Sequence, residues 1–286
     1  RNPKTPIKMV NREGDPFSQT SSDVLGPLKT SNDQKENILT FLCQVTKYLE
    51  VIALGSVTAI TISDLLYERI ITRYGMIETL LTDQGTNFNS QLLKSLCARV
   101  NIKKLFTNPY TPKCNGQAEK INSTIHTALF MVAERYPRTW SRWLSTVQAG
   151  YNQLPNRSTG YPPHTLLMGY TMPTITEIAL GLTKDKPLPK DQQTCKDHII
   201  EMLRKNAVKI AAHYRNQSEK HCNQKAKPLG LKQGDMVYKI IPTCGLKPPK
   251  LKARYEGPMK VIEDHKTHYT IEEPGGKTQK VNDDKL

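Results

Sequence analysis

Hydrophobic positions in the first 170 residues follow two patterns: short apolar runs bounded by turn residues, and longer stripes that repeat every three or four residues. The runs are typical of largely buried strands, and the stripes are typical of amphipathic helices. In chain order they predict strands over residues 17–23, 38–45 and 48–54, a helix over 57–74, a strand over 77–81, a helix from about 90 to 100, a strand over 102–107 and a helix from about 115 to 135. This order indicates a mixed α/β layer fold. The order of the strands within the sheet does not follow from the sequence.

Helical period also predicts which side chains the helices bury. The helix over 57–74 ends at Gly75 and carries on one face Ile62, Leu65, Leu66 and Ile70. The apolar stripe of the helix from about 115 to 135 consists of Ala118, Ile121, Ile125, Ala128 and Val132. Beside that stripe lies a polar face with Glu119, Asn122, Ser123 and His126. On a further helix, Trp140 and Trp143 are predicted to anchor the core rather than to stack on nucleobases.

The pattern changes after residue 170. A helix is predicted over about 191–222, with an amphipathic stripe that could pack on a partner or on the core. Short strands follow over 236–241, 259–263, 268–272 and 277–281, and a small β-barrel is their natural arrangement. The predicted organisation is a polar connector over 1–16, an α/β core over 17–170, a linker with a long helix over 171–230 and an all-β domain over 231–286.

The charge of the chain limits its partners. The formal net charge is +15, and the part from residue 184 onward is the more basic, with 22 Lys and Arg against 13 Asp and Glu. Such a balance favours a polyanionic partner, nucleic acid first, over small acidic substrates, although a solvated basic surface would give the same composition. The longest uncharged stretches fall short of the roughly 18 apolar residues that a membrane span needs, so no membrane partner is expected. Six scattered cysteines without zinc or redox spacing favour a reduced compartment.

Three carboxylates carry the candidate chemistry. Asp83 follows an apolar strand, in Thr-Asp-Gln-Gly-Thr-Asn-Phe over 82–88, and Glu119 ends Pro-Tyr-Thr-Pro-Lys-Cys-Asn-Gly-Gln-Ala-Glu over 109–119. Asp23 lies on the first predicted strand, shortly before Gly-Pro. Divalent cations such as Mg²⁺ prefer carboxylate oxygens, and a pair of them assists phosphoryl transfer most effectively. The three acids are therefore a candidate metal-binding triad, against the alternative of three unrelated surface carboxylates.

These motifs resemble the catalytic core of the integrases of retroviruses and gypsy-type LTR retrotransposons. The resemblance covers residues 17–170 and again 231–286. It implies an RNase H-like mixed-sheet core, a helical linker and a small SH3-like barrel. It also implies a DDE-type polynucleotidyl transferase in which Asp23, Asp83 and Glu119 are catalytic and bind two Mg²⁺ ions, with Mn²⁺ as a substitute. The nucleophile would be water when DNA ends are trimmed and a 3′-hydroxyl when they are joined to target DNA.

Two basic or polar regions are candidates for DNA contact. Near the predicted loop over 108–116, the candidates are Tyr110, Asn115, Gln117 and Lys120, with Lys120 as a point charge for phosphate. Tyr110 and Asn115 would alternatively only shape the loop. In the C-terminal domain, Gly-Asp-Met-Val over 234–237 and Glu-Gly-Pro over 256–258 resemble SH3-like signatures of the same integrases. Between these signatures lie Lys247, Lys250, Lys252 and Arg254, which would contact phosphates or belong to a solvated edge strand.

The sequence departs from the integrase pattern at several positions. Gln44 stands where these integrases usually carry an acid, Tyr255 where a Trp is common and Cys114 where Thr or Ser is more usual. Every histidine lies at or after residue 126, so the N-terminal zinc module of such integrases is not expected in this chain. The first two departures concern peripheral packing, and Cys114 concerns the loop before Glu119.

The leading hypothesis is an integrase that processes and joins retroelement DNA. A domesticated, integrase-derived protein that binds DNA or a partner without catalysis is the alternative, and loss of a triad carboxylate would have favoured it. A nuclease of the RNase H type would not explain the C-terminal barrel. Joining two DNAs predicts double-stranded DNA as partner and a homo-oligomer, a tetramer or larger. The expected location is the host nucleus, or a virus-like particle before integration.

Overall fold

The computed structural model describes residues 14–106, 112–173, 175–181, 192–223, 230–240, 255–265, 268–273, 275–282 and 286, with the backbone alone for several residues, among them 112–119 and 192–199. The described residues form two compact units, the first ending at His213 and the second beginning at Tyr214. Each unit is treated by itself below. No helix among the described residues is long and apolar enough to span a membrane.

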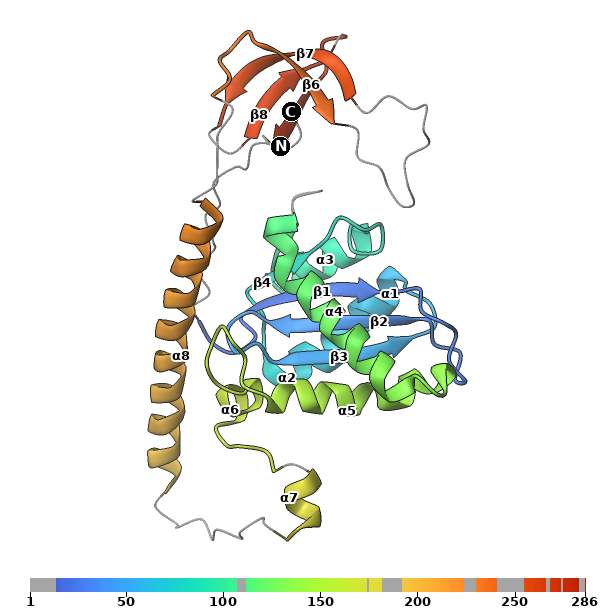
Figure 1. The fold of residues 1–286 in the computed structure, drawn as a ribbon, viewed down its shortest axis with the longest axis vertical. Coiled ribbons are helices and arrows are strands. Elements are labelled where there is room, and N and C mark those ends of the chain that lie inside the picture. The colour runs from blue at the N-terminus through green and yellow to red at the C-terminus, as the bar shows by residue number, and fades with distance from the viewer. Residues whose placement is uncertain are drawn as a thin grey trace. The chain divides into compact units, whose positions relative to one another are not determined.

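The first unit is built on a five-stranded mixed sheet (Figure 1). Its strands are β1 Gln19–Leu25, β2 Asn37–Cys43, β3 Leu49–Leu54, β4 Thr79–Thr82 and β5 Lys103–Phe106, in the order β3-β2-β1-β4-β5. β2 pairs antiparallel with β1 and β3, whereas β4 pairs parallel with β1 and β5. All five strands were predicted, with ends that shift by a few residues.

Helices cover both faces of this sheet, which is why its central strands are apolar on both sides. On β2, Ile38 and Leu42 belong to one core, with residues of α4 (Pro112–Ala133) and α5 (Trp140–Gln153). Leu39, Phe41 and Cys43 alternate with them and belong to the other core, with residues of α1 (Ala59–Leu65) and α3 (Gln91–Arg99). Successive side chains of a strand point to opposite faces, so the near-continuous apolar run of β2 fills both layers.

The helix predicted over 57–74 is one helical stretch with a wider middle. α1 continues into a π-helical segment, η1 (Leu66–Ile71), and then α2 (Thr72–Tyr74), and Gly75 ends it with φ 91°. The buried residues Ile62, Leu66 and Ile70 recur every four positions. Four positions overshoot the 3.6 residues of an α-helical turn, and the wider turn keeps these side chains on one face.

The later helices correct several burial predictions. The Ser90 hydroxyl accepts a hydrogen bond from the Leu93 N–H (3.3 Å) and so caps α3, where the sequence allowed either Asn89 or Ser90. On α4 the buried positions are Ile121, Ile125, Leu129 and Ala133. Val132, expected in the core, is 43% exposed, because the stripe continues through Leu129 and Ala133. On α5, Trp140 is buried as predicted, whereas Trp143 is 42% exposed.

The long helix α8 (Gln192–Asn223) begins in the first unit and packs there on α6 (Pro163–Met168). Arg204 donates from Nε to the Leu166 carbonyl (2.9 Å) and from its guanidinium NH2 group to the Leu167 carbonyl (3.0 Å). These bonds satisfy carbonyls at the end of α6, which have no partner within that helix. The sequence predicted a stripe with Met202 on this helix, but Met202 is 49% exposed, whereas Ala207 is buried.

The second unit is a four-stranded antiparallel sheet in the order β6-β7-β8-β9. Its strands are β6 Met236–Ile240, β7 Tyr255–Asp264, β8 His268–Glu272 and β9 Thr278–Asn282, close to the predicted ranges. One face is apolar and buries Val237, Met259, Val261, Tyr269, Ile271 and Val281. A helix-covered mixed sheet, a long helix and a small antiparallel β unit are the fold class that was predicted.

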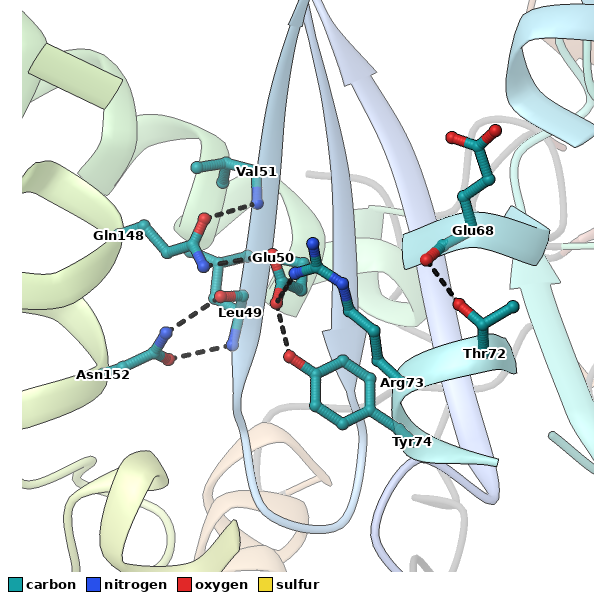
Figure 2. Close-up of polar contacts among 9 residues, drawn as sticks. All are labelled: Leu49, Glu50, Val51, Glu68, Thr72, Arg73, Tyr74, Gln148 and Asn152. Carbon is teal, nitrogen blue, oxygen red and sulfur yellow. Dashed lines mark hydrogen bonds and ion pairs between the residues drawn. The ribbon is translucent and has the colours of Figure 1, made fainter. Parts of the chain in front are cut away.

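The free edge of β3 is closed by side chains of α5 (Figure 2). Asn152 accepts from the Leu49 N–H and donates to the Leu49 carbonyl, both at 2.9 Å, and Gln148 accepts from the Val51 N–H at 3.1 Å. These amides take the hydrogen bonds that a sixth strand would otherwise make. Because the backbone groups at this edge are paired, this part of the sheet offers little template for another strand.

Glu50 is buried beside this edge and joins helices of both layers. Its Oε1 accepts from the Tyr74 hydroxyl (2.5 Å) and its Oε2 accepts from Gln148 Nε2 (3.1 Å), while Arg73 approaches to 3.9 Å (Figure 2). Burial, followed by the hydrogen bond to Glu50, raises the pKa of Tyr74 well above its usual range. The buried carboxylate is thus held by partners from η1–α2 and α5 together.

Candidate active site

Asp23 and Asp83 lie at the same edge of the sheet, on neighbouring parallel strands. Ser21 of β1 is in register with Leu81 of β4, and two further residues along each strand lead to Asp23 and Asp83. Neighbouring strands are about 4.8 Å apart, so this register places the two aspartates side by side. The predicted strand ends therefore deliver both acids to one place.

The Asp23 carboxylate is half-buried and oriented through both of its oxygens. Oδ1 accepts from the Val24 N–H at 2.8 Å, and Oδ2 accepts from Asn122 Nδ2 at 2.9 Å. Asn122 lies on α4, 99 residues further along the chain. This hydrogen bond fixes α4 against the end of β1, and it fixes the direction in which the Asp23 carboxylate points.

Asp83 begins the loop that joins β4 to α3. Its Oδ1 accepts from the Gly85 N–H at 3.0 Å, and a Cβ on residue 85 would lie only 3.1 Å from that oxygen. A side chain at Gly85 would therefore crowd the carboxylate. The glycine of the Thr-Asp-Gln-Gly motif lets the backbone come close enough to hold Asp83.

Glu119, the third predicted carboxylate, lies on α4, and its side chain is outside the described part of the structure. Residues three apart on a helix share a face, and Glu119 precedes Asn122 by three. The helix position of Glu119 is therefore one turn from the residue that contacts Asp23. Among the side chains that are described, no three His, Cys, Asp or Glu groups form a metal cluster. Whether Glu119 completes one stays a prediction.

The chemistry of the described groups suits a hard divalent cation. The register of β1 and β4 brings Asp23 and Asp83 to neighbouring strand ends. Carboxylate and amide oxygens are the ligands that Mg²⁺ and Mn²⁺ prefer. The Asn122 amide oxygen is buried and accepts no hydrogen bond from the described residues, although its amide nitrogen donates to Asp23. A buried acceptor without a partner is costly, and such groups cluster where a site is incomplete without its ligand.

The predicted DNA contacts are described only in part. Lys120 is exposed on α4, directly after the position of Glu119. Asn115 and Gln117 belong to α4, which begins at Pro112, so the predicted loop over 108–116 is shorter than expected. The side chains of these two residues lie outside the described part, as do Tyr110, Lys247, Lys250, Lys252 and Arg254 entirely.

Asn122 is a residue of the candidate site that sequence reasoning did not single out as one. The helical period placed it on the same face as Glu119, which was the available signal. Its partner Asp23 is remote in sequence, so the contact depends on how α4 crosses the sheet. Gln44, the departure from the integrase pattern that directly follows β2, donates to the Ser21 hydroxyl at 2.5 Å.

Comparisons with known proteins identify relatives of the chain in sequence and in fold. No protein-family model matches the chain. The chain is 24% identical over 286 residues to the retrovirus-related Pol polyprotein from transposon 412 of Drosophila melanogaster, which covers 99% of this chain and 23% of the polyprotein. It is 27% identical over 161 residues to the transposon Tf2-3 polyprotein of Schizosaccharomyces pombe, covering 56% of this chain and 12% of that protein. The chain thus spans about a quarter or less of these relatives.

One solved structure shows the fold. A chain of the simian T-cell lymphotropic virus intasome, determined in complex with PP2A regulatory subunit B56 gamma, matches with a TM-score of 0.59 and 15% identity, over 99% of this chain and 81% of that chain. The match covers the mixed sheet, the long helix and the antiparallel β unit. The chain is therefore similar in sequence to the integrase region of retrotransposon and retroviral Pol polyproteins, and it has an RNase H-like core followed by an integrase-type C-terminal domain.

Proposed function

We propose that this chain is an integrase that trims the ends of retroelement DNA and joins them to target DNA by metal-dependent phosphoryl transfer. The observation that supports it most is the parallel register of β1 and β4, which sets Asp23 beside Asp83 next to the helix that carries Glu119. A surface pair of acids would not need an asparagine from a third element to orient one of them. This geometry favours a site that is organised to bind a ligand.

Asp23, Asp83 and Glu119 are the residues that would hold two Mg²⁺ ions, with Mn²⁺ able to replace them. When bound, the ions supply activation of the attacking oxygen and stabilisation of the charge on the leaving 3′ oxygen. The chain itself contributes the direction of the carboxylates. Asn122 and the Val24 N–H fix Asp23, and the Gly85 N–H fixes Asp83. No side-chain nucleophile is required, because water or a DNA 3′-hydroxyl attacks.

The proposed substrate is double-stranded DNA, in agreement with the net charge of +15. Lys120, exposed beside the position of Glu119, would contact a phosphate next to the reacting bond. Joining both ends of an element in step needs more than one active site. We therefore propose a homo-oligomer, a tetramer or larger, that acts in the host nucleus.

The test is a reversal assay on a branched DNA that mimics the joined product, in Mg²⁺ and in Mn²⁺. This reaction asks least of other parts of a longer protein, because the DNA is already assembled. Asp83→Asn and Glu119→Gln are compared with Glu78→Gln, which removes an exposed carboxylate just before β4. The proposal predicts metal-dependent resealing that the first two substitutions abolish and the third leaves unchanged.

Tight DNA binding without strand exchange in either metal would contradict the proposal. It would favour the alternative, an integrase-derived protein that binds DNA without catalysis. Resealing that survives both Asp83→Asn and Glu119→Gln would also contradict it, because the reaction would then use other residues.

A further inference from the structure

Hydrogen bonds and one buried side chain hold the loop between Asp83 and Ser90 in place. After the bond from the Gly85 N–H to the Asp83 carboxylate, the Asn89 N–H donates to the Gly85 carbonyl at 2.8 Å. Phe88 is buried at 3% exposure and anchors the loop in the core. The loop then ends at Ser90, which caps α3. One backbone group in this loop, the Phe88 carbonyl, takes its partner from a different strand.

That partner is Lys104 on the neighbouring strand β5. Lys104 is in register with Leu80, a fully buried residue of the core that includes α3, so the lysine points to that same face. Its Nζ donates to the Phe88 carbonyl and lies over the Phe106 ring, 5.1 Å from the centroid. The Lys104 side chain therefore lies against the loop, with its ammonium group at the Phe88 carbonyl.

The charge of Lys104 is close to the Asp83 carboxylate without contacting it. Burial lowers the pKa of Lys104, and the nearby negative charge of Asp83 is among the influences that oppose that effect. The two side chains nevertheless form no ion pair, although both belong to the described part of the chain. A direct lysine–carboxylate pair would compete with any cation for the same oxygens. Here the ammonium is directed to a carbonyl instead.

We propose that Lys104 is a positioning residue for Asp83: by binding the Phe88 carbonyl it fixes the loop over 83–90 and leaves the Asp83 carboxylate open to divalent cations. This inference rests on the proposed function for its meaning, but its geometry stands independently. Outer partners of metal ligands orient those ligands, and their removal typically costs about 10–100-fold in metal affinity or activity. Lys104 would act in this way through the loop backbone rather than through Asp83 itself.

The chain offers a matched control in Lys103. Lys103 precedes Lys104 on β5, is exposed and points to the opposite side of the strand, so its loss removes the same charge without touching the loop. Lys104→Met keeps the apolar volume of the stem and deletes the donor. We expect Lys104→Met to raise the Mg²⁺ concentration for half-maximal reversal by about 10-fold or more. Lys103→Met should change it by less than about 2-fold.

Hydrogen exchange provides a readout that does not depend on DNA joining. In metal-free protein, the Gly85 and Asn89 amides should exchange at least about 10-fold faster in Lys104→Met than in wild type, because the loop has lost its anchor. A lysine that only stabilised the fold would lower the unfolding temperature without changing the metal midpoint. Binding of MnCl₂ alone, followed by calorimetry, measures that midpoint without substrate.

Equal metal midpoints and equal loop exchange in the Lys103→Met and Lys104→Met variants would overturn the proposal. Lys104→Gln is the second variant, and either Lys104 variant that folds is sufficient to decide. Wild-type protein that binds Mn²⁺ but reseals no DNA would contradict the proposed function, while the exchange and calorimetry comparisons would still test Lys104. The two ideas can therefore fail separately.

Discussion

The outer edge of β3 and the shared end of β1 and β4 both place carboxylates at a margin of the same sheet, yet they treat them in opposite ways. At β3, Glu50 is buried and its two oxygens accept from Tyr74 and Gln148. At the other site, Asp23 and Asp83 are half-buried at the ends of neighbouring strands, and their carboxylates accept hydrogen bonds from backbone N–H groups and from the Asn122 amide. Satisfied polar groups stabilise a fold, whereas like charges held together cost stability and are typical of functional sites.

Burial alone does not distinguish the candidate catalytic acids of this chain from its structural acids. Glu50 is the more buried carboxylate, at 5% exposure, but every contact around it closes the structure. Asp23 is more exposed, and the amide oxygen of its partner Asn122 is buried without a hydrogen bond from any residue that the structure describes. This buried acceptor, which lacks a hydrogen bond from the described residues, distinguishes the candidate site from the cluster around Glu50. The four predictions that follow test this distinction.

The largest expected effect is on activity at the Asp23 site. Asp23→Asn should lower the reversal rate by more than about 10³-fold, because the interaction with metal is worth several kcal/mol in the transition state. The unfolding free energy should change by less than about 1 kcal/mol, since the Val24 N–H retains an acceptor. Reversal kinetics and urea unfolding on the same preparation measure both. A large loss of stability would contradict the comparison.

The next effect is on stability at the β3 edge. Asn152→Ala leaves the Leu49 N–H and carbonyl without partners in a buried position, which should cost about 2–4 kcal/mol of unfolding free energy. Ser145→Ala, at an exposed site on the same helix, is the control and should cost little. Urea unfolding gives the values. Reversal activity per folded molecule should stay unchanged in both variants, and a selective loss in Asn152→Ala would oppose a purely structural role.

A smaller effect on activity is expected at Asn122. Asn122→Ala removes the donor to Asp23 and should lower reversal about 10–100-fold, as for other residues that orient a metal ligand. The exposed Thr127 lies on the same helix, and Thr127→Ala should leave the rate unchanged. Reversal rates across a Mg²⁺ titration measure the effect. If higher Mg²⁺ restored nothing and the variant were simply unstable, Asn122 would belong to the structural group instead.

The smallest expected effect is a pH dependence of the unfolding free energy, which arises at Tyr74, the partner of Glu50. Tyr74→Phe should cost about 1–3 kcal/mol at pH 7, because the hydrogen bond to Glu50 is lost. The raised pKa of Tyr74 keeps its hydroxyl protonated in the folded state. In the unfolded chain the same tyrosine ionises near the ordinary tyrosine pKa of 10.0. Wild-type stability from this group is therefore complete below pH 10 and declines above it.

The difference between wild type and Tyr74→Phe should accordingly shrink as the pH rises past 10. Urea unfolding at pH 7, 10 and 11 measures it, with the exposed Tyr67→Phe as the control. A difference that stayed constant over this range would indicate that Tyr74 does not keep its proton in the folded state.

Local patterns predicted the elements, and the contacts between them needed the structure. The apolar runs gave all five strands of the first sheet, and the resemblance to integrases gave Asp23 and Asp83. Strand order did not follow, because the same runs fit several sheet topologies. Val132 and Trp143 were assigned to the core on hydrophobicity, yet surfaces also carry apolar side chains.

The long-range contacts that sequence reasoning missed share one physical cause. Asn122 contacts Asp23 across 99 residues, and Gln148 contacts Glu50 across 98. Helical and strand periods define faces, but they do not define which face meets which. Lys104 on β5 likewise gains its role only from the loop that the parallel β4–β5 register brings beside it.

The most direct test of the central claim is to locate Mn²⁺ by anomalous diffraction in crystals of the protein bound to a DNA end. We predict an anomalous peak between the Asp23 and Asp83 carboxylates, with Glu119 among its ligands, and loss of that peak in Asp83→Asn crystals. An ion bound elsewhere, with Asp23 and Asp83 sharing none, would contradict the assignment of the active site to the ends of β1 and β4.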